Sequence, residues 1–141
     1  MLARALFVLS VGFLLAADAQ KDDAVKKEKE KLKGTWKSVD EKRQAVIVIT
    51  DDSMTVTLKA GDKDRVYKGT YKLDPSQKPK TLDFMVSEGP DEHKGKTSLQ
   101  IYELDGDKLK WCANEPGKDG RPKEFAAQGG YLLIELKRDK P

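Results

Sequence analysis

Few side chains in this sequence have a type and spacing that could catalyse a reaction. His93 is the only histidine and Cys112 the only cysteine among the 141 residues. One histidine cannot build a histidine-rich zinc or copper site, and Cys112 stands in no sequence motif of a catalytic thiol. We expect His93, in the polar loop GPDEHKG, to be solvated, and Cys112 to be a small buried apolar group.

The acidic residues also lack the spacing of a metal or catalytic site. Asp22-Asp23 lie in a charged N-terminal segment and Asp51-Asp52 at a predicted turn. In both places we expect solvent to surround the carboxylates, so that they have no special reactivity. Asp105-Gly106-Asp107 begins like a calcium loop, but the later ligands are missing and a hairpin turn is predicted. No nucleophile-elbow or phosphate-binding glycine motif occurs. The sequence therefore predicts no enzyme, no metal and no cofactor.

The aromatic residues are better placed for binding than for catalysis. They stand in segments where apolar and polar residues alternate, which puts the apolar residues on one face of a strand. If these strands close into a barrel, that face is the interior, and it would form an apolar pocket with a few phenolic hydroxyls. The residues predicted to line it are Tyr67, Tyr71, Phe84, Leu109 and Trp111.

Eight segments after residue 33 alternate in this way or are short apolar runs. They are 36–39, 45–49, 54–58, 67–73, 82–86, 99–104, 109–113 and 132–136. Turn formers such as Gly61-Asp62 and Asp105-Gly106 separate them, so strands adjacent in sequence should pair antiparallel. We predict an all-β fold, an eight-stranded antiparallel up-and-down barrel, because closure removes both sheet edges. A two-sheet sandwich is the alternative.

The N-terminal residues read as an export signal. Arg4 precedes an apolar run over 5–17, and small residues at Ala17 and Ala19 predict cleavage after Ala19. The run is too short for a stable membrane anchor, since about 20 apolar residues are needed to span a bilayer. We therefore expect a signal peptide over 1–19 and a secreted or periplasmic protein. Residues 20–31 are expected to form a charged linker or a short helix.

Three residues near the barrel's ends predict how it closes. Trp36 opens the first strand and can plug one end, while Gly34 lets the backbone bend around the ring. Arg138 shares the parity of the inward residues of the last strand. In a closed barrel the first and last strands are neighbours, so Arg138 could cover the Trp36 ring in a cation–π contact worth about 0.5–2 kcal/mol.

Longer segments resemble one family. They are LKGTWKSV at 32–39, YKLDPSQKPKTLDF at 71–84, GKTSLQIYELDGDKLKWC at 95–112 and GRPKEF at 120–125. Over 32–138 the chain resembles an uncharacterised, lipocalin-like secreted domain expanded in planctomycete bacteria. This resemblance implies a lipocalin-like barrel and secretion, and it brings no activity, ligand or catalytic residue with it. The segment 40–44, in the first hairpin, is shorter than the family's pattern.

Two functional hypotheses follow. The first is a secreted lipocalin-like domain that binds a small apolar ligand in a modest cavity. The second is a non-enzymatic extracytoplasmic interaction or structural module with a filled barrel, which would meet a protein partner or a second copy through Ala45–Ile49, a strand apolar on both faces. Nucleic-acid binding is not expected, because 27 basic and 24 acidic residues are interspersed without a basic stripe.

Overall fold

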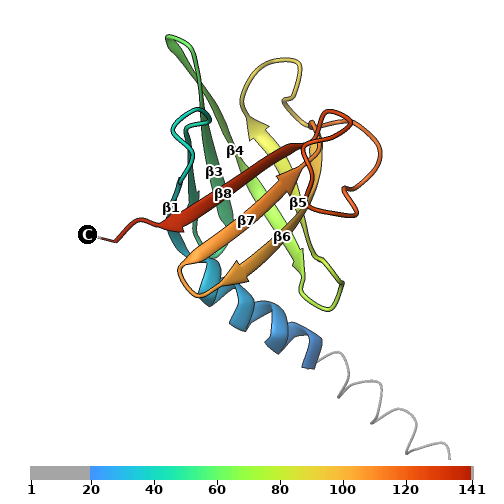
Figure 1. Cartoon of the computed structure of the whole chain (residues 1–141). Helices are drawn as coiled ribbons and strands as arrows, with labels where there is room; N and C mark the ends of the chain where they lie inside the picture. The colour runs from blue at the N-terminus through green and yellow to red at the C-terminus, as the bar shows by residue number, and fades with distance from the viewer. Residues whose placement is uncertain (1–19, 141) are drawn as a thin grey trace, which may run out of the picture.

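The computed structural model describes residues 20–140 as a helix followed by a closed barrel of eight strands (Figure 1). The helix spans residues 20–32, so the segment predicted as a linker or helix is helical. The strands are β1 (Gly34–Ser38), β2 (Ala45–Ile49), β3 (Ser53–Ala60), β4 (Lys63–Asp74), β5 (Lys80–Glu88), β6 (Thr97–Asp105), β7 (Lys108–Ala113) and β8 (Leu132–Arg138). The predicted signal peptide, 1–19, lies outside the described residues.

The predicted fold class is confirmed. Each strand pairs antiparallel with the next along the chain, and β1 pairs with β8 in the register Trp36↔Arg138. The sandwich alternative is wrong, because the sheet closes on itself and has no free edge. The first predicted strand was misplaced slightly, since β1 begins at Gly34 and ends before Val39.

The period of two in the sequence decides which side chains form the core. On β4, Tyr67, Gly69, Tyr71 and Leu73 are buried and the intervening residues are exposed. The same alternation continues on β5, where Leu82, Phe84 and Val86 point inward. Apolar burial along these faces supplies most of the driving force for closing the barrel.

The helix end of the barrel is filled and capped. Trp36 is fully buried, and its indole N–H donates to the carbonyl of Leu32 at 2.8 Å. The guanidinium carbon of Arg138 lies 4.3 Å from the centroid of the Trp36 ring. Two Arg138 nitrogens donate to the carbonyls of Lys31 and Lys33, at 2.5 and 2.8 Å, which satisfies carbonyls left open at the helix C-terminus.

Gly34 makes this close packing feasible. Its backbone φ angle is 131°, a value that residues other than glycine rarely adopt. A Cβ at this position would stand 3.0 Å from Nη1 of Arg138, in the way of the guanidinium group. The structure thus brings Gly34, Trp36 and Arg138 together at one end of the barrel.

A buried glutamate ties the helix to the barrel. Glu28 accepts hydrogen bonds from Nζ of Lys80 at 2.8 Å and from the hydroxyl of Tyr102 at 3.1 Å. Burial, with the Glu28 charge beside it, raises the pKa of Tyr102. Of the two alternatives for this segment, the short helix is therefore the correct one, and Glu28 lies on the helix face between the inward residues Val25 and Leu32.

The outer face of β2 remains open. Val46 is half-buried and Val48 is 38% exposed, so the N-terminal helix does not cover this face. One side of Ala45–Ile49 therefore lies outside the barrel as predicted, while a partner for it stays a prediction. Within residues 20–140, no helix is long and apolar enough to cross a membrane.

Candidate functional site

The five residues predicted to line a pocket are all buried inside the barrel, but they lie at two depths. Tyr67, Phe84 and Trp111 line a cavity at the end away from the helix. Tyr71 lies toward the helix, where its hydroxyl donates to the carbonyl of Thr50 at 2.6 Å and Nζ of Lys29 lies 5.3 Å from its ring centroid. Burial raises the pKa of Tyr71 to about 12.

Leu109 also belongs to the filled end. It pairs with Leu136, two residues before Arg138, and neither leucine lines the cavity. Tyr71 and Leu109 therefore lie in the barrel interior as predicted, but they do not share a cavity with the other three residues. Alternation determines the face of a strand and not the depth along the barrel, which depends on the stagger between strands.

The cavity, which we call the mouth cavity, has a volume of about 250 Å³. Its apolar lining comes from Val56, Leu58, Phe84, Trp111, Ala113, Pro116, Gly130 and Leu132. Its polar lining comes from Arg65, Tyr67, His93, Ser98, Gln100, Asn114 and Glu115. Figure 1 shows the β3–β4 hairpin and the β5–β6 loop, which flank it, at the end of the barrel opposite the helix.

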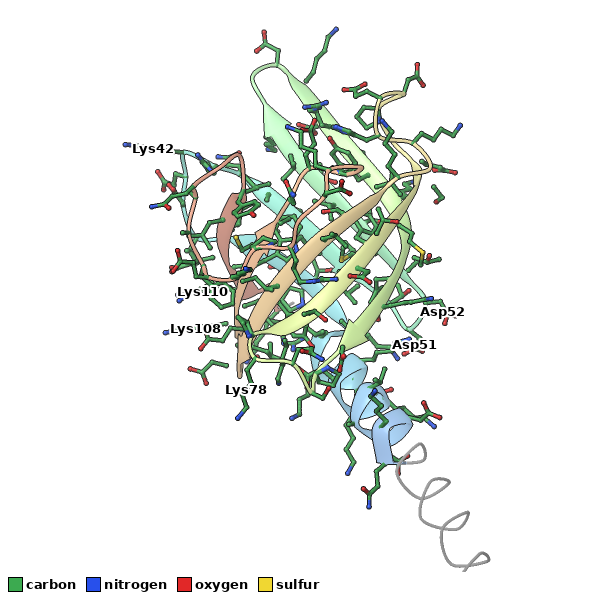
Figure 2. The ribbon with its side chains drawn as sticks, turned by 90° about the vertical axis from the view of Figure 1, so that its right-hand side faces the viewer. Lys42, Asp51, Asp52, Lys78, Lys108 and Lys110 are labelled. Carbon is green, nitrogen blue, oxygen red and sulfur yellow. The ribbon has the colours of Figure 1, made fainter. Side chains whose placement is uncertain are left out.

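The acidic pair Asp51-Asp52 takes no part in this site. Figure 2 shows both residues at the helix end of the barrel. Both side chains are exposed, and Oδ1 of Asp51 forms an ion pair with Nζ of Lys33 at 2.9 Å. Exposed pairs of this kind contribute little to stability. The exposure of both residues agrees with the expectation that solvent surrounds them.

His93 contradicts the expectation for a loop histidine, because it is only 6% exposed. A tight turn in the β5–β6 loop folds the chain back, with the amides of His93 and Lys94 donating to the carbonyl of Pro90. The imidazole then lies on the Tyr67 ring, with centroids 5.7 Å apart. A polar loop sequence gives no local signal for this burial, since the packing partner is 26 residues away.

Both imidazole nitrogens of His93 have partners. Nδ1 lies 3.0 Å from the Tyr67 hydroxyl, and Nε2 lies 2.9 Å from Oε1 of Glu115. The other Glu115 oxygen pairs with Nζ of Lys118 at 2.9 Å. Tyr67, His93, Glu115 and Lys118 therefore form a hydrogen-bonded relay that begins in the cavity and ends at the surface.

The charge on Glu115 determines the direction of every hydrogen bond in this relay. Hydrogen bonds from Lys118 and then from His93 lower the pKa of Glu115 to about 2, so the carboxylate is ionised. It accepts a hydrogen bond, and we assign the hydrogen to Nε2 of His93. In the neutral imidazole Nδ1 is then an acceptor, and the Tyr67 hydroxyl donates to it. Burial raises the pKa of Tyr67, which keeps the phenol protonated.

The opposite wall carries a second chain of hydrogen bonds. Nε1 of Trp111 donates to Oε1 of Gln100 at 2.5 Å, and Nε2 of Gln100 donates to the hydroxyl of Ser98 at 3.0 Å. The Ser98 hydroxyl donates onward to the carbonyl of Asn114 at 2.6 Å. Throughout the described part of the chain, every buried side-chain nitrogen and oxygen has a hydrogen-bond partner.

Sequence reasoning missed Ser98 and Gln100, although a signal was present. Ser98, Gln100 and Tyr102 alternate along β6 and all three are buried. Residues 99–104 read as an apolar run, but the polar residues at positions 98, 100 and 102 alternate and so indicate one common face of the strand. Polar residues at inward positions of a small barrel indicate a hydrogen-bonded interior.

The β7–β8 connection, residues 114–131, completes one wall. Arg121 donates to the carbonyl of Gln100 at 2.8 Å and to the carbonyl of Leu82 at 3.2 Å, and it forms an ion pair with Asp83. These bonds hold the connection against β5 and β6. Cys112 lies under it, fully buried, and burial raises the pKa of its thiol. A protonated, buried thiol agrees with the predicted packing role.

The lining of the mouth cavity combines apolar side chains with the relay and with the Trp111–Gln100–Ser98 hydrogen bonds. Among residues 20–140, no group of three histidine, cysteine or acidic side chains is placed to hold a metal ion. At the rim, Arg65 pairs with Glu92 at 2.8 Å, which balances the charge beside Tyr67. The cavity thus offers apolar walls, one hydrogen-bonded relay and one charge-balanced rim.

The low pKa of Glu115 predicts how acid affects stability. A carboxylate whose pKa is lower in the folded state stabilises the fold above its unfolded pKa, near 4.5, and this contribution is lost as the pH falls toward 2. Glu115→Gln should therefore lose less thermal stability than the original protein between pH 4.5 and pH 2. Glu41→Gln, at an exposed acid, is the control. Equal pH profiles for the protein and Glu115→Gln, measured in low salt, would contradict the relay.

No protein-family model, curated protein or solved structure matches this chain. The resemblance to a lipocalin-like secreted domain therefore stays a prediction. What the structure shows directly is the closed antiparallel barrel with its filled helix end and its mouth cavity.

Proposed function

We propose that this chain is a secreted, lipocalin-like, non-enzymatic barrel that binds a small and mainly apolar molecule in the mouth cavity. The observation that supports this function most strongly is the cavity itself. It is about 250 Å³ in volume and is lined on most sides by apolar or aromatic side chains. An engineered apolar cavity of about 150 Å³ accepts benzene, so this one has room for a single ring with short substituents.

The arrangement of polar groups also favours binding. Gln100 and Ser98 satisfy one another and the indole of Trp111, so they do not require water to fill the cavity. Their hydrogen bonds hold Trp111 in one orientation against the space. A cavity with fixed walls loses little conformational entropy when a ligand enters it.

Secretion is part of this proposal and is supported by the sequence of residues 1–19. The basic start, apolar run and small residues before position 20 match an export signal. A binding barrel outside the cytoplasm would meet small apolar molecules from the environment or from the cell surface.

The cavity predicts stabilisation by a small aromatic probe. Toluene at ten times its Kd should stabilise the fold by about 1.4 kcal/mol, which raises Tm by roughly 5 °C. Ala113→Phe, which places a ring in the cavity, should abolish this shift. The matched control is Val66→Phe, which adds the same ring on the outer face of β4 and should keep the shift.

Two results would contradict binding in the mouth cavity. One is the absence of any toluene-dependent shift in the original protein. The other is an equal shift in Ala113→Phe and in the original protein. If Ala113→Phe does not fold, Leu132→Trp, at a half-buried position of the lining, provides the second blocking variant.

The alternative function is an extracytoplasmic interaction or structural module. It is favoured by the exposure of Val48 on β2 and of Val66 on β4. These strands lie on either side of β3, so both valines belong to one outer surface. This alternative would be favoured if toluene does not raise Tm and the protein forms dimers as its concentration rises.

A further inference from the structure

We propose that the ligand of the mouth cavity is a neutral compound that donates a hydrogen bond, from a hydroxyl or an N–H group, to the phenolic oxygen of Tyr67. This inference rests on the proposed binding function and adds the chemical class of the ligand. It follows from the direction of the hydrogen bonds in the relay.

The hydrogen of the Tyr67 hydroxyl is already committed. Ionised Glu115 accepts from Nε2 of His93, so in the neutral imidazole Nδ1 carries no hydrogen and can only accept. The Tyr67 hydroxyl, 3.0 Å away, therefore donates to Nδ1. A ligand that can only accept finds no hydrogen there.

The lone pairs of the Tyr67 oxygen remain available. A phenolic oxygen can accept hydrogen bonds while it donates its own hydrogen. Among residues 20–140, the bond to His93 is the only hydrogen bond that the Tyr67 hydroxyl makes. Because Tyr67 lines the cavity, a ligand placed against it can supply the missing donor.

The other polar groups of the lining are less able to select a ligand. Both hydrogens of the Asn114 amide are used, on the carbonyls of Asp119 and Gly120 at 3.2 and 2.7 Å. The Ser98 hydroxyl donates to the Asn114 carbonyl. Gln100 is held between Trp111 and Ser98. The phenolic oxygen of Tyr67 is therefore the polar atom of the lining best placed to select among ligands.

The charges around Tyr67 argue for a neutral ligand. Arg65 and Glu92 pair at 2.8 Å, and Glu115 pairs with Lys118 at 2.9 Å, so Arg65 of the lining and Lys118 of the relay each already have an anion. A carboxylate brought into the cavity would lose its hydration without gaining an unpaired cation. Together with the volume, this points to a compound of the size of a phenol.

Matched probes test the inference in the original protein. Phenol and anisole share a ring and an oxygen, but only phenol can donate, and toluene reports on the apolar cavity alone. We expect phenol to bind roughly threefold to tenfold more tightly than anisole, the effect of one neutral hydrogen bond. Dissociation constants are measured by ligand-observed NMR at neutral pH.

Two variants separate the hydrogen bond from the cavity. Tyr67→Phe removes the acceptor, so phenol should lose its advantage over anisole while toluene keeps its affinity within about twofold. His93→Phe frees the Tyr67 hydroxyl to donate to an ether oxygen, so anisole should bind more tightly than it does to the original protein. Toluene again reports whether the cavity is intact in this variant.

The outcomes distinguish the inference about the ligand's chemical class from the proposed binding function on which it rests. Equal affinities for phenol and anisole, with toluene bound, would overturn the inference and leave the binding function standing. Benzoate binding more tightly than phenol would also overturn it, by showing that Arg65 selects an anion. Failure of all four probes to bind would overturn the binding function itself.

Discussion

Replacing Trp36 by alanine should lower the free energy of unfolding by about 3–5 kcal/mol, the usual cost of removing a large aromatic side chain from a core. Trp36 is fully buried at the helix end of the barrel. Its loss would leave a void and would remove the hydrogen bond to the Leu32 carbonyl and the ring beneath Arg138. Urea unfolding followed by circular dichroism measures the change.

Trp36→Phe is the matched control for this prediction. Phenylalanine keeps most of the apolar volume but cannot donate to Leu32, so its cost should be clearly smaller than that of alanine. A loss below about 1 kcal/mol for Trp36→Ala would show that the ring does not hold the barrel and the helix together.

Gly69→Ala should destabilise the barrel by at least about 3 kcal/mol, the upper end of overpacking costs. A Cβ at Gly69 would lie 1.8 Å from the carbonyl oxygen of Met85 and 3.0 Å from Cε1 of Phe84. The first clash is with backbone, so it cannot be relieved without separating β4 from β5. The strands already change register between Lys68 and Gly69.

Gly61→Ala provides the comparison for Gly69→Ala. Nothing lies within 4 Å of a Cβ at Gly61, and its φ of 66° predicts a cost of about 1–2 kcal/mol from strain alone. Both variants are unfolded in urea under the same conditions. If Gly69→Ala costs no more than Gly61→Ala, close packing of β4 on β5 is not what requires glycine at position 69.

The fold could be predicted because its determinants are local. Alternation specifies which face of each strand is buried, and pairs such as Asp105-Gly106 specify short antiparallel connections. Closure was predicted because it removes both sheet edges, and the contact of Arg138 with Trp36 expected from closure is present, since β1 and β8 pair in the structure.

The site was predicted only in part, because depth and loop packing are not local properties. Tyr67 and Tyr71 share one face of β4, yet one lines the mouth cavity and the other packs beside the helix. His93 and Glu28 belong to polar segments and are nevertheless buried by contacts with residues far away in sequence. Such contacts depend on the assembled barrel, so the relay could not be recognised from spacing.

The mouth cavity is tested most directly by intermolecular nuclear Overhauser effects between phenol and the isotope-labelled protein. Binding there predicts contacts from the phenol ring to the side chains of Phe84, Trp111 and Leu132, which line the cavity from three different strands. Contacts confined to the outer valines Val48 and Val66, or no contacts at a saturating concentration, would contradict it.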